Sequence, residues 1–309
     1  MSGQEESFEA AGAMAGQREL EYFAALYEAE RMETEESRER TLKKWDKRAE
    51  AWEAERREGR REPRDERLIS TVEYLKSRSL LTSKQTVADI GCGPGRFATE
   101  FGKTAGHVTG FDLSEKMIGY GKEYVRRAGL ANVSLRCLDF GALDVKKEGL
   151  SRSFDLVVAS LTPALGKVRE LEKMMEMSRA FCFSVSYISS TRPLEEALMG
   201  ELFGRMAKSR GNGRQFYALF NFLFLKGYLP EATYYNRREE RRIFPDDDYI
   251  EGFMEDALYG EERTEENREK VKAWLRNRTE ADGAIRTINT SCYGRLLWDV
   301  RQKREGAGW

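Results

Sequence analysis

The hydrophobic positions between residues 86 and 190 change period several times along the chain. Residues 86–90 form a short apolar run, which is typical of a buried strand, and residues 96–103 have the apolar spacing of a helix. Strands that alternate with helices in this way predict parallel βαβ units, and therefore a three-layer α/β/α sandwich. Further strands are expected at residues 107–111, 133–138, 154–160 and 180–188, and further helices at residues 114–128 and 167–179.

The segments on either side of this alternation have different patterns. Residues 1–16 are acidic, rich in Ala and Gly and poor in large apolar side chains, so we expect a disordered tail. Residues 17–64 combine helical apolar spacing with dense charge, which predicts exposed helices ahead of the core over residues 65–190. Residues 191–283 predict helices, a Gly-rich loop and a strand or hairpin, which we interpret as an insertion that forms a lid. Residues 284–309 contain a final strand that completes the sheet.

Composition narrows the class of protein. The formal net charge of −1 gives no global attraction to nucleic acid or to an anionic membrane. The most apolar stretch, residues 216–225, is far shorter than the roughly 20 residues that span a bilayer. The four cysteines are scattered without a CxxC pair, and His107 is the single histidine, so we expect no disulfide framework and no metal site. We therefore expect a cytoplasmic protein, monomer or homodimer, with no membrane partner and with nucleic acid disfavoured as a partner.

The strongest motif is the run Asp89–Gly95, DIGCGPG, which lies directly between an expected strand and an expected helix. Glycine adopts the φ values of a tight turn at little cost, and its missing Cβ lets a ligand lie against the backbone. The helix that follows presents unpaired N–H groups and the positive end of its dipole to ligand oxygens. The spacing of Gly91, Gly93 and Gly95 differs from the G-x-G-x-x-G of dinucleotide sites, because Arg96 stands where the third glycine would fall.

With its leading acid, this turn resembles the first motif of the class I S-adenosylmethionine (SAM)-dependent methyltransferases. The resemblance covers roughly residues 68–190. It implies a Rossmann-like sandwich with a mostly parallel seven-stranded sheet, and SAM as a cofactor that leaves as S-adenosylhomocysteine (SAH). The residues implied to form the cofactor turn are Asp89, Gly91, Cys92, Gly93 and Gly95. By itself, such a turn is also compatible with a simple tight connection between strand and helix.

Two further acids stand where this family contacts the adenosyl group. Asp112 ends the second expected strand, and the resemblance implies that its carboxylate accepts hydrogen bonds from the ribose hydroxyls. The alternative is that Asp112 only caps the next helix. The D-x-S-x-x-M run that begins there implies that Leu113 and Met117 line the adenine. Asp139 closes the third strand and is implied to receive the adenine amino group, with Phe140 flanking the ring.

The fourth expected strand, residues 154–160, resembles another motif of the family. In such folds the carboxyl end of this strand lies beside the sulfonium, so Ser160, Leu161 and Thr162 are expected to border the transferred methyl group. Pro163 prevents a helix from starting at once.

The charged N-terminal region carries a looser resemblance. Trp45, Ala49 and Trp52 form one helical stripe, and the run over residues 45–52 resembles the W-D-x-x-A-x-x-aromatic run that folds over the cofactor in many small-molecule methyltransferases. This implies that Trp45 contacts the cofactor. The alternative is an exposed helix whose aromatic face only packs on the main domain.

Methyl transfer from a sulfonium is a direct in-line displacement, so the protein mainly supplies positioning and desolvation. A histidine base is not expected, since His107 begins a strand. The segment 160–163 reads SLTP, where many amino-group methyltransferases of nucleic acids and proteins have an N/D-P-P-aromatic motif. We therefore expect a small-molecule acceptor.

The acceptor site is expected under the lid, whose aromatic residues favour an enclosed apolar pocket. Tyr187, Tyr217 and Arg214 are the candidate acceptor-site residues. The alternative for these aromatics is that they are core between a helix and the sheet. Methylation of RNA or protein, with the N-terminal helices as docking surface, and a non-catalytic SAM-binding module remain open alternatives.

Overall fold

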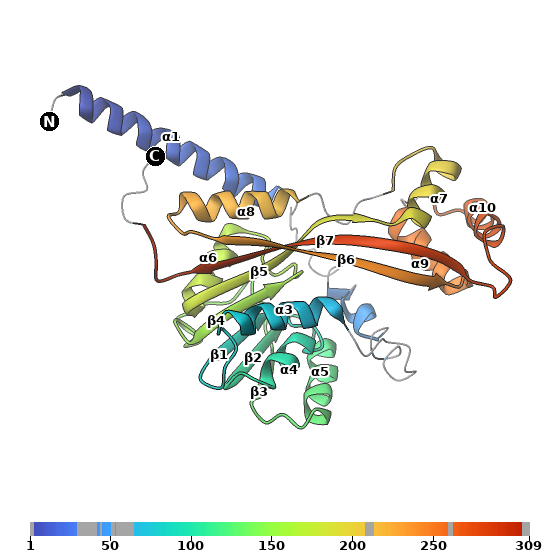
Figure 1. Cartoon of the computed structure of the whole chain (residues 1–309), viewed down its shortest axis with the longest axis horizontal. Coiled ribbons are helices and arrows are strands. Elements are labelled where there is room, and N and C mark those ends of the chain that lie inside the picture. Colours follow the sequence, from blue (N-terminus) through green and yellow to red (C-terminus); the bar gives the residue numbers. More distant parts are fainter. Residues whose placement is uncertain are drawn as a thin grey trace. The chain divides into compact units, whose positions relative to one another are not determined.

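A seven-stranded sheet with the order β3-β2-β1-β4-β5-β7-β6 organises the protein (Figure 1). The structure is a computed structural model that describes residues 3–29, 42–43, 45–50, 53, 65–207, 213–258 and 262–304, with side chains from residue 16. The strands are β1 (Thr86–Ile90), β2 (His107–Asp112), β3 (Val133–Cys137), β4 (Phe154–Ser160), β5 (Ser178–Thr191), β6 (Glu231–Ile243) and β7 (Ile285–Asp299).

Helices cover both faces of the sheet, which confirms the expected three-layer α/β/α sandwich. Figure 1 shows α3, α4 and α5 on one face, and α6, α8 and α1 on the other. The helices of this part are α1 (Gly3–Glu28), α3 (Glu66–Ser77), α4 (Arg96–Gly102), α5 (Glu115–Arg127), α6 (Val168–Met177) and α8 (Arg214–Leu225). The others are α7 (Pro193–Phe203), α9 (Asp247–Ala257) and α10 (Glu265–Arg276).

The order of the strands reverses beside β1, and this positions the site. The chain moves outward from β1 to β2 and β3, and then returns to place β4 on the other side of β1. All three pairings are parallel, and Ile90 at the end of β1 is level with Phe111 in β2 and Ala159 in β4. The connections that follow β1 and β4 therefore diverge to opposite faces, and they leave a crevice between them at the carboxyl ends of the strands.

The chain divides into two units by the contacts within it. Unit 1 comprises Met1–Ser186, Arg214–Tyr235 and Gly294–Trp309, and unit 2 comprises Tyr187–Gly213 and Asn236–Tyr293. Strands β5, β6 and β7 each have residues in both units. Helix α8 lies in unit 1, although it falls within the expected lid over residues 191–283. Its aromatics Phe216 and Phe222 are buried, as the core alternative predicts.

Unit 2 has a hydrophobic core of its own. Helices α7, α9 and α10 pack their apolar faces together and against the unit-2 ends of β6 and β7. Its members include Leu198, Ile250, Val271, Trp274, Leu275 and Ile285. The amphipathic spacing of α9 and α10 explains their part of the core, because an amphipathic helix buries one apolar stripe.

The N-terminal region differs in part from its expected organisation. Helix α1 begins at Gly3, within residues 1–16 that we expected to be a disordered tail. Seven of these sixteen residues are Ala or Glu, which have high intrinsic helix propensity that a count of large apolar residues does not capture. Most of the charged segment over residues 34–61, including Trp52, lies outside the described residues.

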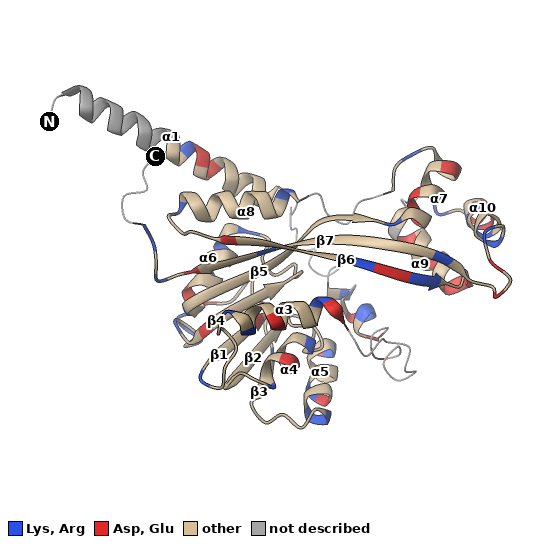
Figure 2. Ribbon diagram, in the orientation of Figure 1, with Lys and Arg blue, Asp and Glu red and all other residues tan. Residues whose placement is uncertain are grey.

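Charge is distributed along the surface in mixed sign, as Figure 2 shows. The run Arg237–Arg242 on β6 pairs within itself, since Arg237 lies 3.1 Å from Glu239 and Arg238 lies 2.9 Å from Glu240. Residues two apart share one face of a strand, which explains these pairs. Because β6 is one of the two edge strands, its charges also oppose pairing with a further strand. In the described part of the chain, no helix is both long and apolar enough to cross a membrane.

The core of unit 2 can be tested with two isoleucines in different environments. Ile250 in α9 is fully buried, whereas Ile288 in β7 is 39% exposed. Ile250→Ala leaves a cavity, so we expect it to lower the free energy of unfolding by about 2–5 kcal/mol, measured by urea denaturation. Ile288→Ala should lower this free energy by about 1 kcal/mol or less. Equal effects of the two substitutions would contradict the packing described for unit 2.

Candidate functional site

A cavity of about 460 Å³ lies in unit 1 at the carboxyl ends of the first four strands. Its wall is made by the turn after β1, the end of β2, and the loops that follow β3 and β4. Of the residues predicted from the sequence, those that line it are Trp45, Gly91, Gly93, Asp112, Leu113, Asp139, Phe140, Leu161 and Thr162. Asp89, Cys92, Gly95, Met117 and Ser160 are not among its lining residues, although Cys92 and Ser160 are next in sequence to residues that are.

The glycine turn is shaped by close packing at two of its positions. Gly91, Gly93 and Gly95 have φ of 66°, 53° and 71°, in the region that favours glycine. A Cβ on Gly91 would lie 1.9 Å from Oγ1 of Thr162, and one on Gly95 would lie 2.9 Å from Leu135. A Cβ on Gly93 would meet nothing within 4 Å, which leaves open space on the cavity side of the turn.

Asp112 joins the end of β2 to this turn. Its Oδ2 accepts a hydrogen bond from the backbone N–H of Gly93 (2.8 Å), and its Oδ1 accepts one from Ser114 (2.9 Å). Each carboxylate oxygen has a second lone pair, so a fixed carboxylate can still accept from a ligand hydroxyl on the cavity side. Burial raises the pKa of Asp112, and the backbone N–H donors oppose that rise.

Asp89 is a buried acid behind the turn. It is 2% exposed, and its Oδ2 has no hydrogen-bond partner among the described residues. Burial, together with the charge of Asp112, raises the pKa of Asp89 to about 8. Arg67 at the start of α3 opposes this rise, and its guanidinium also lies 3.3 Å from the hydroxyl of Ser160. Arg67 was not predicted, because one arginine in a charged helix has no distinguishing sequence signal.

The loop after β3 is held in place by its own acid and by α6. Oδ1 of Asp139 accepts from the N–H of Gly141 (2.9 Å), and Lys173 of α6 donates to the carbonyls of Phe140 (3.3 Å) and Gly141 (2.8 Å). Phe140 is 4% exposed and borders the cavity. These bonds fix an apolar face and a carboxylate beside each other, which suits a heteroaromatic ring with an amino group.

The loop after β4 contains a strained residue at the cavity wall. Leu161 has φ of 52°, a conformation that costs a non-glycine residue on the order of 1–3 kcal/mol. Thr162 next to it fills the space where a Cβ of Gly91 would lie. Glu170, 5% exposed, reaches the same cavity from α6. The sequence did not predict Glu170, because it lies ten residues beyond the strand motif.

The described part of the N-terminal charged segment reaches the cavity. Trp45 lines it, and Arg48 stacks over the Trp45 ring at 5.0 Å. Asp46 accepts a hydrogen bond from the hydroxyl of Ser114, which caps α5 (2.6 Å). Glu50 pairs with Lys116 at 2.6 Å. The segment is thereby attached to the first turn of α5, beside Asp112.

The three residues predicted for an acceptor site lie in different surroundings. Tyr187 belongs to unit 2, where its ring packs against Tyr293 at 4.9 Å. Tyr217 in unit 1 is 54% exposed and packs edge-on against Phe23 of α1 at 5.5 Å. Arg214 begins α8 in unit 1. Neither Tyr217 nor Arg214 is among the residues that line the cavity.

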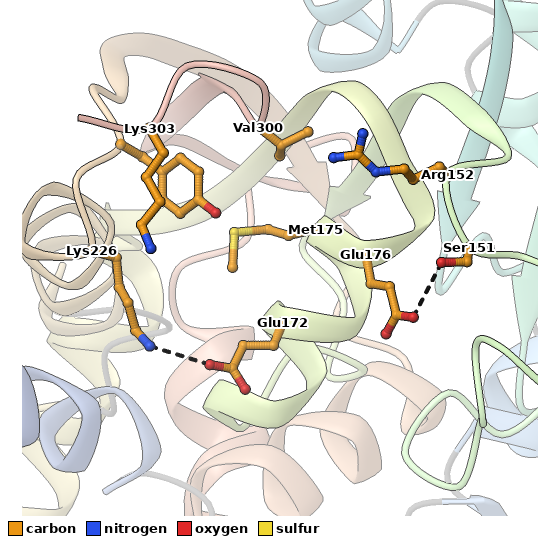
Figure 3. A pocket seen from close by; sticks show the side chains of 9 residues that line it. Ser151, Arg152, Glu172, Met175, Glu176, Lys226, Val300 and Lys303 are labelled. Carbon is orange, nitrogen blue, oxygen red and sulfur yellow. Dashed lines mark hydrogen bonds and ion pairs between the residues drawn. The ribbon is translucent and has the colours of Figure 1, made fainter. Parts of the chain in front are cut away.

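A second cavity of about 380 Å³ in unit 1 lies around the C-terminal half of α6 and holds paired charges (Figure 3). Lys226 lies 3.5 Å from Glu172, and the hydroxyl of Ser151 donates to Glu176 (3.2 Å). The glycine turn borders the first cavity and has no residue in the second.

The first cavity fits an adenosyl cofactor. The open space at Gly93 leaves room for a ligand against the turn, and the fixed carboxylate of Asp112 suits a pair of hydroxyls. Asp139 and Phe140 suit an amino-bearing ring on the other side. Together they offer the donor and acceptor pattern that the resemblance to SAM-dependent enzymes implies.

Comparison with known proteins finds the following similarities. Residues 81–220 match a family model described as a methyltransferase domain. A candidate methyltransferase from Bacillus halodurans C-125 is 12% identical over 75% of this chain and 99% of its own, with a TM-score of 0.48. Magnesium protoporphyrin IX methyltransferase from Synechocystis PCC 6803 with bound SAH is 13% identical over 74% of this chain and 80% of its own, with a TM-score of 0.41. No curated protein matches the chain at a significant level.

The buried acid predicts a dependence of stability on pH in the ligand-free protein. The pKa of Asp89 is about 8 in the folded protein and about 3.8 in the unfolded chain, so the folded state binds this proton more tightly. Stability should therefore fall as pH rises from about 4 to about 8. Between pH 5 and pH 8 we expect a loss on the order of 2–4 kcal/mol, measured by denaturant unfolding.

Asp89→Asn should reduce this loss, because it removes the charge and keeps the shape of the side chain. Asp112, whose pKa is also raised, should account for a residual slope. Asp155→Asn is the control. Partial burial of Asp155 is outweighed by hydrogen bonds from Arg179 and the backbone, which lower the pKa of Asp155, so this carboxyl is already ionised at pH 5 and adds no slope between pH 5 and pH 8. An unchanged slope in Asp89→Asn would contradict this account.

Proposed function

We propose that the chain is a cytoplasmic class I SAM-dependent methyltransferase that methylates a small molecule, a proposal supported by the match of residues 81–220 to a methyltransferase-domain model. The observation that carries the cofactor assignment is the cavity that brings together Gly91, Gly93, Asp112 and Asp139 from three separate strand ends. In this proposal the glycine turn after β1 binds the amino-acid part of SAM, which carries the carboxylate. Asp112 receives the ribose hydroxyls, and Asp139 with Phe140 holds the adenine.

The residues of this chain contribute position and exclusion of water. Bound SAM supplies a methyl group on a sulfonium that is already activated, so the protein does not need to activate the methyl donor. Leu161 and Thr162 border the methyl side in this proposal, and their loop supplies apolar and hydroxyl surface. His107 begins β2, one strand length from Asp112, so it does not act as a base on the acceptor.

A small-molecule acceptor is supported by two features of the chain. The net charge is −1, and among the described residues Lys and Arg are interspersed with Asp and Glu (Figure 2), so the charge gives no global attraction to RNA. Unit 2 contains most of residues 191–283, the stretch that the sequence predicts as a lid, and it packs around a hydrophobic core of its own. Tyr187, Tyr217 and Arg214 remain our candidates for contacts with the acceptor.

Cofactor binding can be tested with substitutions in the turn and at the ribose acid. Gly93→Val and Asp112→Ala should each weaken SAH binding at least tenfold in calorimetry. The first strains the turn and fills its open side, and the second removes the hydroxyl acceptor. Gly149→Val is the matched control, because Gly149 also has positive φ (67°) and open space around it but lies away from the cavity. Wild-type affinity in both site variants would contradict the assignment.

The acceptor class can be tested with SAM labelled on its methyl group. The enzyme is incubated separately with a small-metabolite extract, with total RNA and with denatured protein. We expect label to enter the small-molecule fraction only. Label in RNA, accompanied by salt-sensitive RNA binding, or label in protein would contradict the small-molecule proposal. Tight SAH binding with no transfer to any fraction would indicate a non-catalytic SAM-binding module.

A further inference from the structure

Helix α1 contacts the loop between β4 and α6 at two consecutive residues. Tyr27, which is 3% exposed, donates its hydroxyl hydrogen bond to the backbone carbonyl of Leu165 at 2.8 Å. Glu28 accepts a hydrogen bond from the backbone N–H of Val168 at 2.8 Å. Val168 is the first residue of α6, so Glu28 places a carboxylate at a helix N-terminus, where the dipole favours negative charge. These contacts join positions about 140 residues apart in the sequence.

The same stretch of loop is anchored from two other directions. Oε2 of Glu170 accepts from the N–H groups of Gly166 (2.8 Å) and Lys167 (2.9 Å). Gln215 of α8 donates to the carbonyl of Leu165 at 3.4 Å. Glu170 belongs to α6, the helix into which the loop leads, whereas α1 and α8 bind the loop from the helical layer outside it. Of the outer contacts, those of Tyr27 and Glu28 are the shorter (2.8 Å each).

The other half of this loop is part of the cofactor cavity. Residues 161–164 line it, and Leu161 there is held at φ of 52°. Thr162 packs so closely on Gly91 that no side chain fits between them. The positive φ of Leu161 persists only where several surrounding contacts hold the backbone in place.

The connection between the two halves is short and stiff. Thr162, Pro163 and Ala164 alone separate the strained Leu161 from Leu165. Pro163 has a fixed φ, and the N–H of Ala164 is bonded to the hydroxyl of Thr162 at 3.1 Å. A shift of Leu165 is therefore transmitted to Leu161 rather than absorbed.

We propose that α1 is a strap that holds the β4–α6 loop in its cavity-forming conformation, with Tyr27 and Glu28 as positioning residues for the methyl side of the cofactor. The assignment of that side rests on the proposed function. The strap itself rests on the contacts above. Its consequence is that order in the N-terminal helix, outside the core over residues 65–190, determines how well the methyl side is formed.

The first test uses the full-length, ligand-free protein and hydrogen exchange of backbone amides. Tyr27→Phe removes one hydroxyl and keeps the ring, and Glu28→Ala removes the carboxylate. We expect the amides of Gly166, Lys167 and Val168 to exchange at least several-fold faster in both variants. Tyr22→Phe and Glu19→Ala are the matched controls on the exposed face of the same helix, and Tyr22 is 60% exposed. Unchanged exchange of these amides in both variants would overturn the strap.

The second test separates the two sides of the cavity by calorimetry. A lost hydrogen bond of about 0.5–1.5 kcal/mol corresponds to about a 2- to 10-fold weaker affinity, so Tyr27→Phe should weaken SAH binding by that factor. Adenosine lacks the sulfur and the amino-acid chain of SAH, and therefore has no atoms on the methyl side of the cavity. It should bind the variant and the wild type equally. Equal loss for both ligands, or no loss for SAH, would overturn the positioning role. Failure of the wild type to bind SAH would instead overturn the proposed function, while the exchange test still decides the strap.

Discussion

The site depends on one contact between backbones, that of the turn after β1 against the end of β2. The N–H groups of Gly91 and Cys92 both donate to the carbonyl of Phe111, at 2.8 and 3.0 Å, and the N–H of Gly93 donates to Asp112 at 2.8 Å. This approach is possible because the glycines accept positive φ and have no Cβ to clash. It brings the glycine turn and the carboxylate of Asp112 together before any ligand arrives. The strained loop after β4 then closes on Gly91 from the other side.

The charges around this contact are unbalanced in favour of acids. Asp89 and Asp112 are both buried enough to have raised pKa values, and each carries no salt bridge among the described residues. Asp139 and Glu170 add carboxylates at the wall, where Arg169 is the cation that lines the cavity. Carboxylates near a site favour a positively charged ligand, since opposite charge offsets part of their desolvation. A sulfonium with an amino group has that charge.

The N-terminal region contacts the cavity on two sides. Asp46 and Trp45 lie beside Asp112 and the start of α5, whereas Tyr27 and Glu28 hold the loop after β4. The two contacts come from different elements of the same extension, and both involve the first turn of a helix that flanks the crevice. The core sheet supplies the pattern of acceptors, and the extension fixes the loops around it.

The sequence alone determined the strands and helices of the core, because their apolar periods differ and each is bounded by its own turn residues. It also determined Gly91, Gly93, Asp112 and Asp139 as a group, since a glycine turn and strand-ending acids are local patterns that a parallel sheet brings to one edge. Only the tertiary structure decided the partners that act across long separations, such as Tyr27, Arg67 and Glu170. A tyrosine or glutamate in a charged helix has no local signal, because its role depends on which carbonyl or N–H the fold places beside it. For the same reason α8 lies with unit 1 rather than with the rest of the expected lid: its apolar face predicted burial, but not the surface on which it is buried.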